Sequence, residues 1–234
     1  MRVETLGGLR VRIAGGTDRE GGGDGPVVVL MHGFGAPGDD LASLWRVIDA
    51  PAGTRFVFPE APLAPPELGG GRAWWKIDLE AIQRSIAYGK PRDLSGETPE
   101  GLAEARAAVV AMLDDVDRSL RPSKVALGGF SQGAMLACDV ALQTERPLAA
   151  LVLLSGTYLT KDEWDPLMGR RRGLPVFLSH GAADGMLPFS QSDRLRDALT
   201  GAGLAVTWVP FRGGHEIPSP AVAALGPFLR AALG

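Results

Sequence analysis

The sequence is poor in cysteine and histidine: its 234 residues include one cysteine, Cys138, and three histidines. A single cysteine excludes an internal disulfide and any metal site built from several cysteines. The sequence also has no apolar run near the roughly 18 residues of a membrane-spanning helix, so we expect no membrane span. Its net charge of −3 excludes a broadly basic surface, and we therefore expect no nucleic-acid partner.

The rest of the composition is that of an ordinary globular protein, with 45% hydrophobic and 22% charged residues. A chain of this length fits one domain, which we expect to cover residues 1–234. The first residues do not contain a basic segment followed by an apolar one. We therefore expect no signal peptide and a cytoplasmic location.

Short β-branched segments alternate with segments of helical periodicity along the chain. Residues 27–31 (VVVLM) are apolar without interruption, which is typical of a strand buried on both faces of a sheet. This alternation predicts an α/β fold with a mostly parallel central sheet and helices on both faces. Residues 3–13 predict an antiparallel hairpin at the N-terminus, with its turn at Gly7-Gly8. Further strands are expected at residues 55–58, 125–127, 150–154, 175–179 and 205–210, and helices at residues 98–120, 132–145, 190–199 and 221–233.

Residues 129–133 (GFSQG) match the G-x-S-x-G pattern, and this is the one match in the chain. The pattern lies between an expected strand and an expected helix, which is the setting of a nucleophile elbow. Gly129 and Gly133 allow the strand and the helix to approach closely, while the sharp turn presents Ser131 above the sheet. We therefore interpret Ser131 as a catalytic nucleophile; a tight turn with an unreactive serine is the alternative.

A serine nucleophile requires a base, and the three histidines are the candidates. His32 and His180 each end an expected strand and are followed by glycine, so we interpret both as structural residues. His215 lies in residues 213–216 (GGHE), after the last expected strand and before the last expected helix. Because ligands bind at the carboxyl edge of such sheets, His215 is the predicted base.

The base in turn requires a carboxylate that orients it. Asp184 follows an expected strand and therefore also lies at the carboxyl edge of the sheet. The resulting order along the chain, Ser131 then Asp184 then His215, is that of the α/β-hydrolases. Asp162 and Asp165 are the alternatives, although their charged segment (KDEWD) is more typical of a solvent-exposed surface.

Residues 33–38 (GFGAPG) match the G-x-G-x-x-G pattern of dinucleotide-binding loops, and Glu60 lies about 20 residues on, where a ribose-binding acid belongs. An NAD-dependent oxidoreductase is therefore the alternative from another class of protein. Pro37 removes a backbone N–H group from the loop, and the charges of Asp39 and Asp40 would repel a pyrophosphate, so this alternative is disfavoured. In a hydrolase the same loop can supply a backbone N–H group to an oxyanion hole.

Six short segments follow one another along nearly the whole chain. They are residues 32–35 (HGFG), 72–74 (RAW), 129–133 (GFSQG), 154–156 (LSG), 180–184 (HGAAD, followed by Pro188) and 214–216 (GHE). With this set the chain resembles the phospholipase/carboxylesterase family of α/β-hydrolases, which includes the acyl-protein thioesterases. The resemblance implies a single α/β-hydrolase domain with Ser131, Asp184 and His215 as its catalytic triad. It also implies that the backbone N–H groups of Phe34 and Gln132 form the oxyanion hole.

The predicted function is that of a serine carboxylesterase, which hydrolyses short- to medium-chain carboxylic esters through an acyl-enzyme intermediate. An acyl-protein thioesterase or a lysophospholipase with the same triad is the alternative within the family, and a non-catalytic binding module is the alternative outside it. Side chains and backbone N–H groups suffice for this chemistry, so we expect no cofactor and no metal. The expected partner is a small-molecule ester, and a homodimer is left open.

The longest irregular stretch, residues 59–98, is rich in proline and contains the adjacent Trp74 and Trp75. Loops of this length are usually functional or disordered, and two neighbouring tryptophans argue against disorder. We expect Trp74 and Trp75 to bind the substrate as a wall of the acyl pocket, with core packing as the alternative. Because the prolines restrict the backbone, we expect a fixed wall and not a moving lid.

Overall fold

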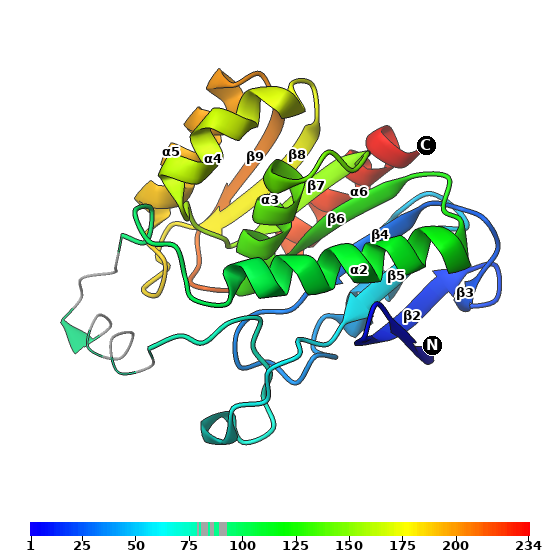
Figure 1. Cartoon of the computed structure of the whole chain (residues 1–234). Helices are drawn as coiled ribbons and strands as arrows, with labels where there is room; N and C mark the ends of the chain where they lie inside the picture. The colour runs from blue at the N-terminus through cyan, green and yellow to red at the C-terminus, as the bar shows by residue number, and fades with distance from the viewer. Residues whose placement is uncertain (79, 81–83, 85–86, 89–92) are drawn as a thin grey trace.

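A computed structural model describes residues 1–78, 80, 84, 87–88 and 93–234 of the chain. Within these residues one sheet of nine strands runs through the molecule, in the order β1-β2-β5-β4-β6-β7-β8-β9 with β3 beside β2 (Figure 1). The strands are β1 (Arg2–Leu6), β2 (Leu9–Gly16), β3 (Glu20–Gly22), β4 (Val27–Met31), β5 (Arg55–Pro59), β6 (Val125–Phe130), β7 (Ala150–Leu154), β8 (Pro175–Gly181) and β9 (Ala205–Phe211).

The antiparallel pairs of the sheet lie at its N-terminal edge. Strands β1 and β2 form a hairpin that pairs Arg2 with Ile13 and Leu6 with Leu9, and β2 runs antiparallel to β5. Each neighbouring pair from β5 to β9 is parallel. The predicted α/β fold, a mostly parallel sheet after an antiparallel hairpin, is therefore confirmed. Parallel pairing also brings the carboxyl ends of β4, β6, β7, β8 and β9 to one edge of the sheet.

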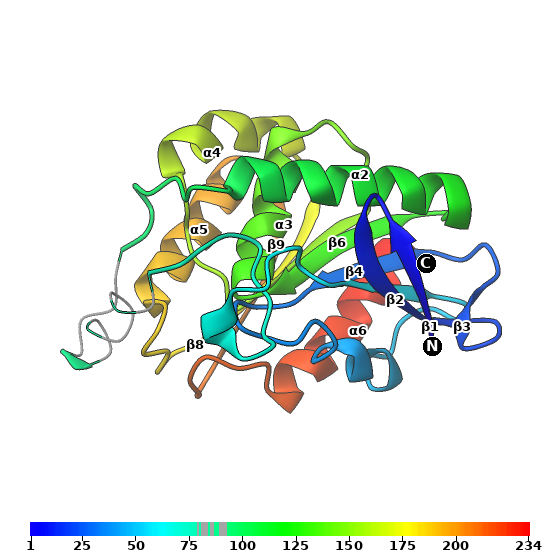
Figure 2. The same cartoon turned by 60° about the horizontal axis from the view of Figure 1, so that its bottom comes forward.

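Helices cover both faces of the sheet (Figure 2). Side chains of α2, α3, α4 and α5 enter one apolar core, and those of α6 and of the short 3-10 helix η1 enter a second core on the opposite face. Strand β4 contributes Val29 to the first core and Val28 to the second, because successive side chains of a strand point to opposite faces. No helix among the described residues is long and apolar enough to span a membrane. The helices are η1 (Ala42–Arg46), η2 (Pro66–Leu68), α2 (Leu102–Leu120), α3 (Gln132–Gln143), α4 (Lys161–Met168), η3 (Gly169–Arg171), α5 (Phe189–Gly201) and α6 (Ser219–Leu233).

Two helices differ from the expectation based on sequence. Helix α2 begins at Leu102 and not near Thr98, because Gly101 before it has a φ of +93° and the Thr98 hydroxyl donates to a carboxylate of α4. Helix α4 itself occupies a segment whose charges predict an exposed surface. Its buried side chains are Trp164 and Met168, four residues apart on one face, so the apolar stripe is short and hidden among charged residues.

Candidate active site

The nucleophile elbow joins β6 to α3, and Ser131 lies at its tip. Ser131 has a φ of +54°, a conformation that costs energy for any residue with a side chain and that occurs mainly at functional sites. A Cβ atom on Gly129 would lie 2.5 Å from both the Met31 carbonyl oxygen and the backbone of Gly133. The two glycines therefore permit the close approach of β4, β6 and α3 that forces this turn.

Ser131, His215 and Asp184 form one hydrogen-bonded chain across the carboxyl edge of the sheet. The Nδ1 atom of His215 lies 2.7 Å from Oδ2 of Asp184, and its Nε2 atom lies 2.8 Å from Oγ of Ser131. A carboxylate only accepts hydrogen bonds, so Nδ1 carries the proton and Nε2 accepts the serine hydroxyl. The structure thus brings together the three residues that the sequence analysis selected, in the arrangement of a nucleophile, a base and an orienting acid.

The Asp184 carboxylate is buried and saturated with hydrogen bonds. Its Oδ1 atom accepts the backbone N–H groups of Met186 and Leu187, at 2.8 and 2.9 Å. Its Oδ2 atom faces His215 and also Nε2 of His180, at 3.2 Å. Burial alone raises the pKa of the Asp184 carboxyl, but hydrogen bonds from His180, His215 and Leu187 hold that pKa well below its usual range. Asp184 is therefore anionic beside His215 at neutral pH.

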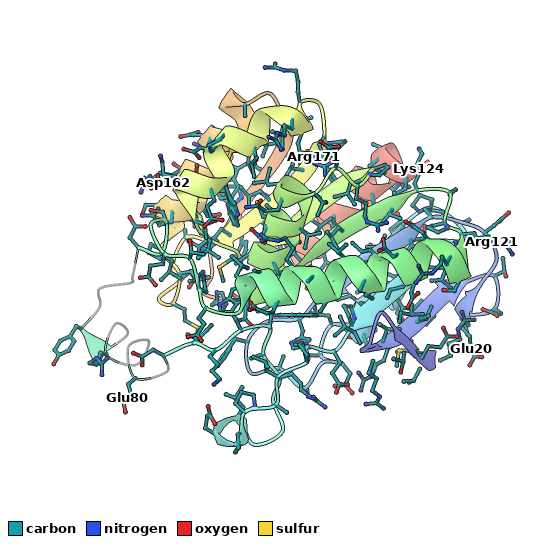
Figure 3. The ribbon with its side chains drawn as sticks, viewed as in Figure 1. Glu20, Glu80, Arg121, Lys124, Asp162 and Arg171 are labelled. Carbon is teal, nitrogen blue, oxygen red and sulfur yellow. The ribbon has the colours of Figure 1, made fainter. Side chains whose placement is uncertain are left out.

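The alternative acids lie elsewhere, on α4. Asp162 is exposed and lies at the outer side of this helix (Figure 3). Asp165 accepts the hydroxyl of Tyr158 and forms an ion pair with Lys161 at 2.9 Å. Asp162 is therefore exposed and Asp165 is paired on its own helix, whereas Asp184 is the carboxylate that contacts His215.

The loop that carries His215 is tied to the neighbouring loop and to the end of β7. The backbone N–H of Ala183 donates to the carbonyl of Gly213 at 2.9 Å, which joins the Asp184 and His215 loops. The hydroxyl of Ser155 donates to the carbonyl of Glu216 at 3.0 Å. Ser155 is fully buried and has a φ of +48°, so it is a second strained residue beneath the site.

The other two histidines are buried at strand ends, as expected, but they differ in one respect. His32 accepts the backbone N–H of Ala61 at 3.0 Å and lies against the ring of Trp74. His180, in contrast, contacts the acid of the site. This contact is not among the sequence-based predictions, although the spacing of His180 and Asp184 across the end of one strand is a signal that could have indicated it.

An apolar cavity of about 260 Å³ opens beside Ser131. The side chains around it are mostly aliphatic, aromatic or thioether groups, so the cavity suits an apolar chain that ends at the serine. Its lining residues are Gly33, Phe34, Ile77, Leu94, Phe130, Ser131, Gln132, Met135, Met186, Leu187 and His215.

Trp74 and Trp75 do not belong to the described lining of this cavity, so the expectation that they wall the pocket is wrong. Both are core residues, 1% and 3% exposed. The side-chain amide of Gln132 accepts the backbone N–H of Trp74 and donates to the backbone carbonyl of Trp75. The indole N–H of Trp74 donates to the backbone carbonyl of His32. These bonds hold the backbone of both tryptophans and the indole of Trp74 in the interior. The stretch from 59 to 98 contributes Ile77 and Leu94 to the lining instead.

Phe34 and Gln132, the residues implied for an oxyanion hole, both line the cavity next to Ser131. Gln132 is the first residue of α3, and the first N–H groups of a helix have no acceptor within the helix. The loop of Phe34 is held by paired backbone hydrogen bonds: Gly35 donates to Arg72, and Arg72 donates to Ala36, each at 2.8 Å. Both residues therefore lie beside Ser131 at the cavity, and donation from their backbone N–H groups to a substrate oxygen stays a prediction.

The surroundings of the 33–38 loop do not support a dinucleotide site. Glu60 is buried and forms ion pairs with Arg10, Arg12 and Arg72, so its carboxylate is not available to a ribose. The loop leads into the short 3-10 helix η1 and not into the α-helix whose N-terminus would bind a pyrophosphate. The structure therefore disfavours an NAD-dependent oxidoreductase.

Comparison with known proteins places this geometry in a family. The model of the phospholipase/carboxylesterase family matches residues 20–233. Acyl-protein thioesterase 1 of Gibberella zeae is 25% identical over 219 residues, which cover 87% of this chain and 88% of the relative. The corresponding protein of Kluyveromyces lactis is 29% identical over 171 residues, which cover 69% and 71%.

Solved structures agree with this result. The crystal structure of esterase PE8 has a TM-score of 0.79 and 26% identity, with all of both chains covered. Acyl-protein thioesterase 2 of Zea mays shares the fold, with a TM-score of 0.69 and 23% identity over 96% of this chain and 99% of that one. Because the family model covers most of the chain, this protein belongs to the phospholipase/carboxylesterase family of α/β-hydrolases and is a hydrolase.

Proposed function

We propose that this protein hydrolyses acyl thioesters, with Ser131 as the nucleophile, His215 as the general base and Asp184 as the orienting acid. The observation that carries the proposal is the 2.8 Å contact of Ser131 Oγ with His215 Nε2 beside an apolar cavity. The relatives named acyl-protein thioesterases favour a thioester over the short- to medium-chain carboxylic ester predicted from the sequence. Thioesters and oxygen esters pass through the same acyl-enzyme, so the proposal changes the leaving group and not the chemistry.

The first half of the reaction acylates the serine. Ser131 Oγ attacks the acyl carbonyl carbon while His215 Nε2 takes the hydroxyl proton, and Asp184 stabilises the imidazolium that forms. The carbonyl oxygen gains negative charge and accepts the N–H groups of Phe34 and Gln132, each worth roughly 3 kcal/mol in such sites. The tetrahedral intermediate then collapses, the carbon–sulfur bond breaks, and the imidazolium proton goes to the departing thiolate.

The second half releases the acid. A water molecule gives its proton to His215 Nε2 as its oxygen attacks the acyl-enzyme carbonyl. The same two N–H groups stabilise the second oxyanion. Collapse of this intermediate breaks the ester bond to Ser131, and the proton on His215 returns to the serine oxygen. The products are a carboxylic acid and a thiol, and the enzyme is restored.

The acyl group occupies the cavity in this proposal. Ile77, Leu94, Met135 and Met186 present apolar side chains along it. Each methylene group that enters contributes about 0.8 kcal/mol of transfer free energy. A cavity of about 260 Å³ holds a limited length of chain, so we propose acyl groups of medium length as the preferred substrates.

A matched pair of substrates tests the proposal. The thioester octanoyl-N-acetylcysteamine and the octanoyl oxygen ester of N-acetylethanolamine differ only in the leaving atom. We expect the wild-type protein to hydrolyse the thioester with a kcat/KM at least equal to that of the oxygen ester. Ser131→Ala is expected to reduce both rates by more than about 1000-fold.

Each other outcome has a distinct meaning. Turnover of the oxygen ester without turnover of the thioester would replace the proposal with a carboxylesterase, the second candidate, which the likeness to esterase PE8 supports. Unchanged rates in Ser131→Ala would refute the assignment of Ser131 as the nucleophile. A serine-directed fluorophosphonate is expected to label Ser131, which mass spectrometry of the digested protein checks.

A further inference from the structure

A second imidazole lies on the carboxylate of the active site. His180 is the penultimate residue of β8, and its side chain is completely buried. Its Nε2 atom lies 3.2 Å from Oδ2 of Asp184 and 3.1 Å from the carbonyl oxygen of Leu187. The Oδ2 atom of Asp184 is therefore shared between two histidines, one of which, His215, faces the serine while the other is sealed in the interior.

The partners of His180 decide which of its nitrogen atoms carries the proton. A carboxylate oxygen and a carbonyl oxygen are both pure acceptors, so Nε2 must be the donor. The Nδ1 atom is buried and has no hydrogen-bond partner among the residues that the structure describes. In the neutral imidazole this leaves only a lone pair unpaired, whereas a protonated ring would leave a charged N–H group without an acceptor. His180 is therefore a neutral donor.

We propose that His180 is a positioning residue that holds Oδ2 of Asp184 in line with Nδ1 of His215. The proposal rests on the catalytic roles proposed above for Ser131, His215 and Asp184. The backbone N–H groups of Met186 and Leu187 anchor Oδ1, and the buried His180 anchors Oδ2.

Loss of the His180 donor would affect the transition state and not substrate binding. The carboxylate could then rotate about the bond that carries it, because two donors would still hold Oδ1 but only His215 would hold Oδ2. Asp184 acts on the imidazolium that exists only during the reaction, so weaker alignment lowers kcat. His180 is not part of the described lining of the cavity, so KM should remain the same.

Three substitutions separate the hydrogen bond from the packing of the ring. His180→Gln places an amide N–H near the position of Nε2 and preserves the donor. His180→Asn carries the same amide on a shorter side chain that does not reach Asp184. His180→Phe keeps a ring of similar size without a donor. Phe189→Leu is the matched control, because the Phe189 ring lies against His180, with 6.1 Å between ring centroids, on the first residue of α5.

Hydrolysis of octanoyl-N-acetylcysteamine is measured for all variants, with circular dichroism and thermal melting as checks of folding. We expect His180→Phe and His180→Asn to lower kcat about tenfold, with KM within about twofold of wild type, as a hydrogen bond to a charged group predicts. His180→Gln and Phe189→Leu should stay within about threefold of wild type. If His180→Phe does not fold, the comparison of Asn with Gln decides the question.

A double-mutant cycle with Asp184→Ala provides the decisive test. If His180 acts through Asp184, adding His180→Phe to Asp184→Ala should cause no further loss of kcat. An equal tenfold loss in that background would show a general structural effect and overturn the inference. Wild-type kcat in both His180→Phe and His180→Asn would also overturn it, while the proposed function would stand. A wild-type protein without any turnover would refute the proposed function, and this inference would fall with it.

Discussion

The close approach of α3 to β4 makes Gly133→Ala the sharpest test of the elbow. A Cβ atom at residue 133 would overlap the Met31 carbonyl oxygen, and it would lie 2.5 Å from the Met31 carbonyl carbon and 2.7 Å from the His32 carbonyl oxygen. Non-bonded atoms pack about 3.5–4.0 Å apart, so helix and strand would have to separate by roughly 1 Å. All three contacted atoms belong to the backbone at the end of β4. Unlike the end of a flexible side chain, they cannot move aside.

This displacement should cost both activity and stability. A shift of about 1 Å between catalytic groups can lower the rate by roughly 100-fold, and Ser131 immediately precedes the helix that must move. Overpacking of a core costs about 1–3 kcal/mol, which corresponds to a decrease of Tm by roughly 2–12 °C in a protein of this size. Hydrolysis of octanoyl-N-acetylcysteamine and thermal melting followed by circular dichroism measure the two effects.

A methyl group added where there is room provides the control. A Cβ atom on Gly201, at the end of α5, would have no neighbour within 4 Å. Gly201→Ala should therefore keep the wild-type kcat and gain up to about 1 kcal/mol from helix propensity. If Gly133→Ala kept a kcat within threefold of wild type and an unchanged Tm, the argument that these glycines enforce the elbow would be refuted.

Three further predictions concern the oxyanion hole, the core and the acid. Phe34→Pro should lower kcat about 100-fold more than Phe34→Ala, because only proline deletes the backbone N–H; equal kcat values in two folded variants would exclude that donor. Trp74→Ala should lower the free energy of unfolding by about 3–5 kcal/mol, since the indole is a core group; urea denaturation measures this, and a near-zero change would contradict the burial. Asp184 has a native pKa below its unfolded value of about 3.9, so its contribution to stability is present above that pH and is lost as the pH falls through the native pKa. The difference in unfolding free energy between wild type and Asp184→Asn should therefore shrink from pH 6 to pH 3, and a difference that grew toward acid would reverse the sign of the argument.

The sequence by itself determined the features that depend on neighbours along the chain. The elbow is local: two glycines around Ser131, a strand before it and a helix after it are all contiguous in the sequence. The apolar run of β4 likewise indicates a strand buried on both faces, because its apolar side chains point to both faces of the sheet. The scarcity of histidine then reduced the choice of base to three residues, and strand-end glycines separated His215 from the other two.

Only the tertiary structure decided which distant side chains meet. The position of Trp74 in a long irregular stretch favours a pocket wall, but bonds to residues 42 and 58 positions away hold it in the core. The contact of His180 with Asp184 depends on how the chain turns after β8, and its importance depends on His215, which comes from another strand end. The charged sequence of α4 does not by itself indicate a helix. The helix is recognised only when the structure shows that Trp164 is buried. Burial and hydrogen bonds between remote segments follow from the path of the chain in space, and no local pattern of residues specifies that path.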